Sequence, residues 1–146
     1  MPTLEHGMIA VNISAAIKAY IKQRGIGRVA VEASYRADEK NVFLPDVSYS
    51  HDTEKPVSTK GSVLYLPDLA VEIKSPDSSY EERREKAKVY LKNGTRLVWL
   101  VYPGKKLIEV YRPNQDSELL TIEDILEGGE VLEGFTLPIR EVFDLG

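Results

Sequence analysis

The chain has 146 residues, of which 42% are hydrophobic and 29% charged, with a net charge of −4 and no cysteine. This profile is typical of one globular domain, expected over residues 1–146, and the missing cysteines exclude disulfides and thiolate metal sites. The acidic balance argues against a protein that coats nucleic acid by charge. No apolar run approaches the roughly 20 residues that span a bilayer and residues 1–7 lack signal-peptide features, so a cytoplasmic chain without a membrane segment is expected.

Apolar spacing along the chain predicts an α/β domain. Isoleucines at 9, 13, 17 and 21 lie on one helical face, and residues 28–36 alternate as in a strand. A strand-helix-strand passage between 68 and 101 favours a parallel pair in a mixed sheet. In the first half of the chain, we expect a helix over 7–25, a strand over 27–36, and a polar turn over 37–41 that makes a hairpin with a strand over 42–49. A flexible loop over 51–61 leads to a strand over 64–73 or from 68, and a helix follows from an N-cap at Asp77 or Ser78 to Lys92. The remainder is expected to hold strands over 95–101 and 107–111 and short apolar pieces at 119–122, 131–132 and 135–138.

Two short strings carry the chemistry that stands out. They are Leu44-Pro45-Asp46-Val47 and Val71-Glu72-Ile73-Lys74, and each falls in a predicted strand. Side chains two apart on a strand share a face, so Glu72 and Lys74 are aimed together. If the neighbouring strand brings Asp46 to the same edge, two carboxylates can hold a hard cation such as Mg²⁺ or Mn²⁺. Lys74 would then orient or deprotonate a water that attacks a phosphodiester.

Each of these residues also has a plainer interpretation. Asp46 could cap a turn, and Lys74 could be an edge lysine that reaches water. Glu72 could form a structural ion pair, but it lies in the most apolar strand, where an unpaired charge costs several kcal/mol. That cost favours a metal-site role for Glu72.

Other charged residues are weighed by their positions. Asp68 lies about 13 Å from Glu72 along a strand, which favours a turn or strand-end role. Glu32 either extends the acidic cluster or pairs with an arginine. Lys86 either faces the cleft as a phosphate contact or is a solvated partner of Glu82. His6 is expected at the helix start or in packing, and the core is expected to include Tyr90 and Trp99.

The order of elements and the two strings resemble the PD-(D/E)xK nuclease superfamily. Pro45-Asp46 matches its first motif element and Glu72-Ile73-Lys74 its second. The stretch from Pro67-Asp68 through Ser75-Pro76, Lys86 and Tyr90 to Trp99 resembles the Uma family of restriction-endonuclease-like proteins, over about residues 5–145. The resemblance implies a restriction-endonuclease-like mixed β-sheet flanked by helices. It also implies that Glu5 is an accessory acidic residue from the first helix.

The leading hypothesis is a Mg²⁺-dependent endonuclease that hydrolyses DNA, with Asp46 and Glu72 as metal ligands and Lys74 beside the water. A homodimer is expected, because cutting two strands needs two centres. The main alternative is a catalytically silent binding or regulatory module of the same fold, which the acidic pI of about 5.3 favours. A hydrolase of small phosphoesters is disfavoured, because the chain has no Gly-rich phosphate loop and no serine nucleophile elbow.

Overall fold

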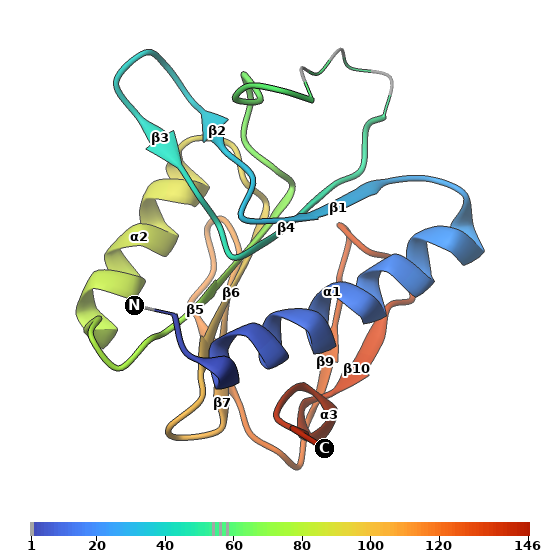
Figure 1. Ribbon diagram of the computed structural model, residues 1–146, viewed down its shortest axis with the longest axis vertical. Helices are drawn as coiled ribbons and strands as arrows, with labels where there is room; N and C mark the ends of the chain where they lie inside the picture. Colours follow the sequence, from blue (N-terminus) through green and yellow to red (C-terminus); the bar gives the residue numbers. More distant parts are fainter. Residues whose placement is uncertain (1, 54, 56, 58) are drawn as a thin grey trace.

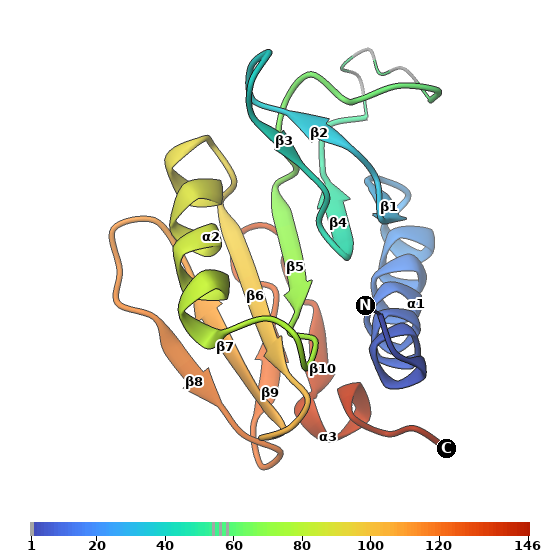
Figure 2. The ribbon, with the colours of Figure 1, turned by 60° about the vertical axis from the view of Figure 1, so that its left-hand side comes forward.

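A computed structural model describes residues 2–53, 55, 57 and 59–146 and contains a mixed sheet between helices (Figure 1 and Figure 2). The main sheet has the strand order β1-β4-β5-β6-β7-β8, in which only β5 and β6 are parallel. Two further pairs are antiparallel, β2 with β3 and β9 with β10. The elements are α1 (Leu4–Arg24), β1 (Arg28–Val31), β2 (Tyr35–Arg36), β3 (Val42–Phe43), β4 (Val47–Ser50), β5 (Leu69–Ile73), α2 (Tyr80–Lys92), β6 (Leu97–Tyr102), β7 (Leu107–Tyr111), β8 (Glu118–Leu120), β9 (Ile125–Glu127), β10 (Thr136–Pro138) and α3 (Ile139–Val142).

The first face of the sheet is covered by α1 and by the C-terminal segment. The four isoleucines of α1 pack against Val71, Trp99 and Val101 of the central strands, and Leu126 and Leu137 of the β9–β10 pair join the same cluster. Figure 2 shows α1 and α2 on opposite sides of the sheet. This layer buries most of the apolar surface and fixes the position of α1 beside β4 and β5.

The second face is covered by α2. Ala87 and Tyr90 of α2 pack against Ala70, Val98 and Leu100. Two glutamates are buried on this face as well, Glu72 in β5 and Glu109 in β7. Both pair in register with Leu100 of β6, so the two carboxylates lie at one level of the sheet with β6 between them.

The helices form where their periodicity predicts them, with shifted starts. Thr3 caps α1 by accepting from the His6 amide, so the helix begins three residues before the expected Gly7, and it ends at Gly25 with φ of 73° as expected. The N-cap of α2 is Ser79, which accepts from the Glu82 amide. The expected caps Asp77 and Ser78 are therefore wrong by one or two residues.

The strand predictions need larger corrections. The strand over 27–36 is wrong in part, because Glu32 has a φ of 51° and breaks it into β1 and β2. The strand over 64–73 begins only at Leu69, since Pro67 precedes it and Leu64 is exposed. The 37–41 turn does join a hairpin, now between β2 and β3. The strand β9 was not predicted, and residues 54, 56 and 58 of the expected loop lie outside the described residues.

The predicted fold class is confirmed as an α/β mixed sheet flanked by helices, and the crossover from β5 through α2 to β6 joins a parallel pair as expected. Within the described ranges, we find no helix with the length and apolar character that a membrane span requires.

Candidate functional site

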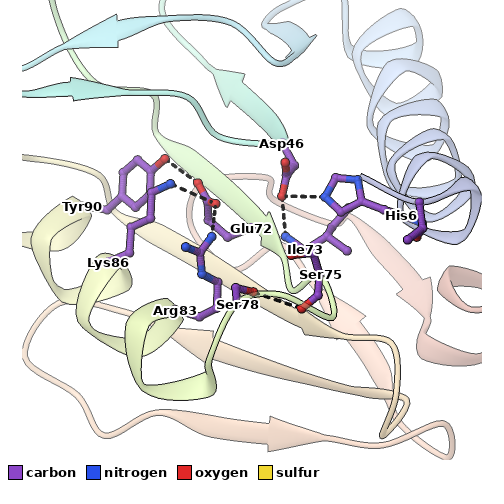
Figure 3. Close-up of polar contacts among 10 residues, drawn as sticks. His6, Asp46, Glu72, Ile73, Ser75, Ser78, Arg83, Lys86 and Tyr90 are labelled. Carbon is purple, nitrogen blue, oxygen red and sulfur yellow. Dashed lines mark hydrogen bonds and ion pairs between the residues drawn. The ribbon is translucent and has the colours of Figure 1, made fainter. Parts of the chain in front are cut away.

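Asp46 lies at the point where β4 begins and is bonded to both chain neighbours of Glu72. Its amide donates to the Val71 carbonyl at 3.0 Å, and its Oδ2 accepts from the Ile73 amide at 2.6 Å. The strand β4 begins only at Val47, so here the Asp46 carboxylate takes the place of a backbone carbonyl as the acceptor for the Ile73 amide. His6 of α1 approaches the same oxygen with Nε2 at 3.3 Å (Figure 3).

Glu72 points from β5 toward α2 and is 2% exposed. Its Oε1 accepts from Arg83 Nη1 at 3.1 Å and from Lys86 Nζ at 3.2 Å. Its Oε2 accepts from the Tyr90 hydroxyl at 2.8 Å. Figure 3 shows the three donors on one side of β5 and the Asp46–His6 pair on the other.

Burial and charge act on the Glu72 carboxyl in opposite directions. Burial raises its pKa most strongly, the Lys86 ammonium lowers it, and the Asp46 carboxylate raises it again. The net result is a raised pKa. The Asp46 carboxylate therefore acts on the pKa of Glu72 in the same direction as burial does.

The Lys74 amine lies away from both carboxylates. Its Nζ donates to the Ser75 carbonyl at 3.2 Å and sits 4.7 Å from the centre of the Tyr80 ring. Lys105 lies over the same ring at 4.5 Å. Lys74 therefore joins a cationic group at the start of α2, and Lys86 is the lysine that touches Glu72.

The accessory residues fall into two groups. Lys86 bonds Glu72 and faces the site, which excludes the solvated pairing with Glu82. Glu5 is exposed in the first turn of α1. Glu32 is exposed too, although its amide donates to the Asp46 carbonyl at 3.2 Å and fixes its backbone beside the site.

Three contacts around the carboxylates were not predicted. The sequence predicts no role for Arg83, a core position for Tyr90, and a helix-start or packing role for His6. A signal was present in α2, because positions 83, 86 and 90 share one helical face, and two of them carry cations that oppose a buried glutamate. Asp68 has the strand-end role that was expected, since Oδ2 accepts from the His51 amide at 2.7 Å.

A second buried carboxylate, Glu109, has a complete set of partners. Oε1 accepts from Tyr102 at 2.6 Å and Arg84 at 3.1 Å, and Oε2 from Ser117 at 2.8 Å and Tyr111 at 3.2 Å. Burial alone would raise the pKa of Glu109, but the hydrogen bonds from Tyr102, Ser117 and Arg84 outweigh it and lower the pKa. Glu109 is a structural anchor for α2.

The carboxylate oxygens suit a hard divalent cation such as Mg²⁺ or Mn²⁺. A carboxylate offers about four lone-pair sites, and Glu72 uses three, while both contacts of Asp46 described above fall on Oδ2. Mg²⁺ needs only one or two carboxylates, because waters and substrate phosphate complete its shell. Among the described residues, no group of three or more His, Cys, Asp or Glu could hold an ion. Asp46 Oδ1 and one lone-pair site of Glu72 therefore remain for a magnesium ion, whose other ligands would be waters or phosphate.

Comparison with known proteins identifies the family of this chain. Residues 1–140 match the Uma2 family, described as a putative restriction endonuclease, and the chain belongs to that family. A crystal structure of a putative nuclease belonging to DUF820 from Anabaena variabilis ATCC 29413 superposes with a TM-score of 0.86 at 26% identity. The match covers 98% of this chain and 82% of that one. Comparison with curated proteins yields no match.

Proposed function

We propose that this protein is a Mg²⁺-dependent endonuclease that hydrolyses phosphodiester bonds of DNA, with Asp46 and Glu72 as the metal ligands. One observation carries the proposal. Asp46 is hydrogen-bonded to the residues on both sides of Glu72, in a member of a family described as a putative restriction endonuclease. Mg²⁺, or Mn²⁺ in its place, would neutralise phosphate charge and lower the pKa of an attacking water.

The protein side chains have distinct tasks in this proposal. Arg83, Lys86 and Tyr90 hold the Glu72 carboxylate in one orientation, and His6 and the Ile73 amide hold that of Asp46. Preorganised ligands of this kind avoid reorganisation during the reaction. Lys74 orients the attacking water or stabilises phosphate charge, which requires its amine to leave the Tyr80 ring. Glu5 and Glu32 are accessory acidic residues near the site.

Cation binding tests the metal site without relying on activity. In a Mn²⁺ titration followed by the EPR signal of the free ion, Asp46→Asn and Glu72→Gln should each weaken binding by about tenfold or more. Asp68→Asn is the matched control and should bind as the parent chain does. Equal binding by all four proteins would remove Asp46 and Glu72 as ligands.

The role of the amines is tested by DNA cleavage in Mg²⁺. Lys74→Ala should lower the cleavage rate by about a hundredfold while leaving Mn²⁺ binding unchanged, because the amine acts on water or phosphate. Lys86→Ala should change Mn²⁺ binding as well, since Lys86 touches Glu72. Full cleavage by Lys74→Ala would remove Lys74 alone from the mechanism.

A second candidate function has its own support. Glu72 already has two cations and a phenol as partners, which is sufficient for a structural ion pair. A catalytically silent binding or regulatory module of this fold would retain that cluster. The absence of both Mn²⁺ binding and cleavage, in a chain that folds normally, would favour this function.

The proposal includes a homodimer and a cytoplasmic location. Cleavage of both strands of a duplex needs two centres, and a two-fold dimer supplies them with one interface.

A further inference from the structure

The outer edge of β1 is open in the described structure. β1 is a terminal strand of the main sheet and pairs only with β4 within it. Glu32 donates to the Asp46 carbonyl, so in the alternating antiparallel pattern the backbone groups of Arg28 and Ala30 also point toward β4. The amides and carbonyls of Val29 and Val31 point outward. An edge of this kind is a template for another strand.

The side chains along this edge are apolar and adjoin a groove. Val31 is 54% exposed and Val11 of α1 is 62% exposed. An open groove of about 330 Å³ runs between the two elements and is also lined by Ser14, Ala15, Lys18, Val29 and Ala30. Strands at sheet edges usually carry charged residues or proline as protection, and β1 has only one such residue, Arg28 at its start, followed by Val29, Ala30 and Val31.

The stretch formed by β1 and the residue after it, Glu32, is complementary to itself, although the φ of 51° at Glu32 ends the regular strand. Residues 28–32 read Arg-Val-Ala-Val-Glu. In an antiparallel pair centred on Ala30, Arg28 of one copy faces Glu32 of the other, at both ends, and Val29 faces Val31. This register pairs the outward backbone groups of Val29 with those of Val31, giving four hydrogen bonds.

Both charged residues are compatible with that pairing. Glu32 is exposed. Arg28 donates through Nη2 to the Asp52 carbonyl and the Tyr65 hydroxyl, and a guanidinium has five N–H donors. The other terminal strand, β8, lacks this symmetry, because a pair centred on Leu119 would place Glu118 opposite Leu120.

We propose that two copies of this chain dimerise by antiparallel pairing of their β1 edges about a two-fold axis through Ala30, which joins the two sheets into one. The inference rests on the homodimer of the proposed function and names its interface. Exposed Val11 and Ala15 of both copies then pack across the axis on the α1 face. Opposite-charge cross-strand pairs select a second copy over an unrelated strand.

The pairing also positions the two candidate centres. Asp46 is bonded to Glu32, two residues from the axis, and lies one strand inward from β1. With strands about 4.8 Å apart and a rise of about 3.4 Å per residue, the two Asp46 residues lie about 20 Å apart. Both centres thus lie near the interface, where one duplex can reach them.

A single cysteine tests the register, because the chain has none of its own. In a non-hydrogen-bonded antiparallel pair the Cα atoms are about 4.5 Å apart, which suits a disulfide. Ala30→Cys should therefore form a covalent dimer under mild oxidation, whereas Leu119→Cys on the exposed edge of β8 should remain monomeric on a non-reducing gel. Equal cross-linking of the two variants, or cross-linking of Leu119→Cys alone, would overturn the proposed interface.

Sedimentation at several concentrations provides the second test. The parent chain should sediment as a dimer, and Glu32→Lys should weaken the dimer about tenfold or more, since both ion pairs become repulsive. Glu39→Lys, in the β2–β3 turn, makes the same charge change and should have no effect. A parent dimer that Glu32→Lys leaves intact overturns the interface only. A monomeric parent overturns the proposed homodimer as well, and DNA cleavage by that monomer would leave the nuclease proposal standing.

Discussion

Glu72 is the residue on which both the stability of the buried ion pairs with α2 and the proposed metal chemistry depend. Arg83, Lys86 and Tyr90 satisfy it in a buried place, and Asp46 adds a second negative charge nearby. Breaking a buried ion pair by removing one partner costs about 3–5 kcal/mol. Substitutions at Glu72 therefore change stability and chemistry together, whereas its partners allow the two to be separated.

Tyr90→Phe is the first such separation. The change deletes one hydroxyl that donates to Glu72 Oε2 and keeps the ring that packs against Phe43. A hydrogen bond to a buried charged group is worth about 1.5–3 kcal/mol, and urea unfolding should show a loss in that range. Tyr20→Phe loses an exposed hydrogen bond to the Glu133 carbonyl and should change stability by less than about 0.5 kcal/mol. Equal losses for the two variants would mean that the Tyr90 hydroxyl does not stabilise Glu72.

Glu109→Gln tests the second carboxylate through its dependence on pH. The folded-state pKa of Glu109 is lowered, so its stabilisation is complete above the ordinary value of 4.5 and is lost as the pH falls through the folded pKa. The variant should be about 2 kcal/mol less stable than the parent at pH 7, and the difference should shrink below pH 4.5. Glu118→Gln, at an exposed 4.0 Å pair with Arg112, should differ little at either pH. A gap for Glu109→Gln that is the same at pH 7 and pH 3 contradicts this assignment.

The elements are positioned by a few backbone constraints, one of which is the entry into β1. Gly27 has a φ of 108°, and a Cβ there would lie 2.5 Å from the Tyr49 ring. Gly27→Ala should lower the melting temperature and cost about 2 kcal/mol or more, through strain and overpacking. Gly7 lies in α1 with open space around it, so Gly7→Ala should be neutral or stabilising by up to about 1 kcal/mol. A neutral Gly27→Ala would show that this close approach does not constrain β1.

Periodicity predicted the elements whose burial is one-sided or complete. The isoleucine stripe of α1 appears where the pattern placed it, β6 lies within two residues of its expected bounds, and β5 occupies the second half of its expected range. The break at Glu32 was not predictable, because a positive φ at glutamate has no sequence signature. Leu64 extended the apolar pattern of β5, yet it remains exposed outside the strand, since Pro67 separates it from the ladder.

Asp46 and Glu72 could be singled out from the sequence as candidate ligands, which stays a prediction, whereas the contacts around them could not. A glutamate within Leu-Ala-Val-Glu-Ile is conspicuous because buried charge is costly, and Pro45-Asp46 marks a strand start. Arg83 looks like any charged residue on a solvated helix face until α2 is docked against β5. His6 reaches Asp46 only through the packing of α1, which no local pattern encodes.

At the scale of the whole molecule, the two helical layers have different roles. The α1 layer holds most of the apolar core and contributes His6, while α2 carries the three partners of Glu72. The candidate centre lies at the β4–β5 boundary between them, and the open β1 edge lies one strand away. A net charge of −4 is consistent with the proposed nuclease, in which a cation would neutralise the carboxylates before DNA binds.

The most direct test of metal-dependent DNA cleavage at Asp46 and Glu72 compares the parent chain with Asp46→Asn on supercoiled plasmid, with and without Mg²⁺. Asparagine retains an oxygen that can accept from the Ile73 amide, so the variant should melt close to the parent. The parent should nick or linearise the plasmid only with the metal, and the variant should be slower by about a hundredfold or more. Cleavage that persists in Asp46→Asn, or that proceeds equally without a divalent cation, would contradict the account.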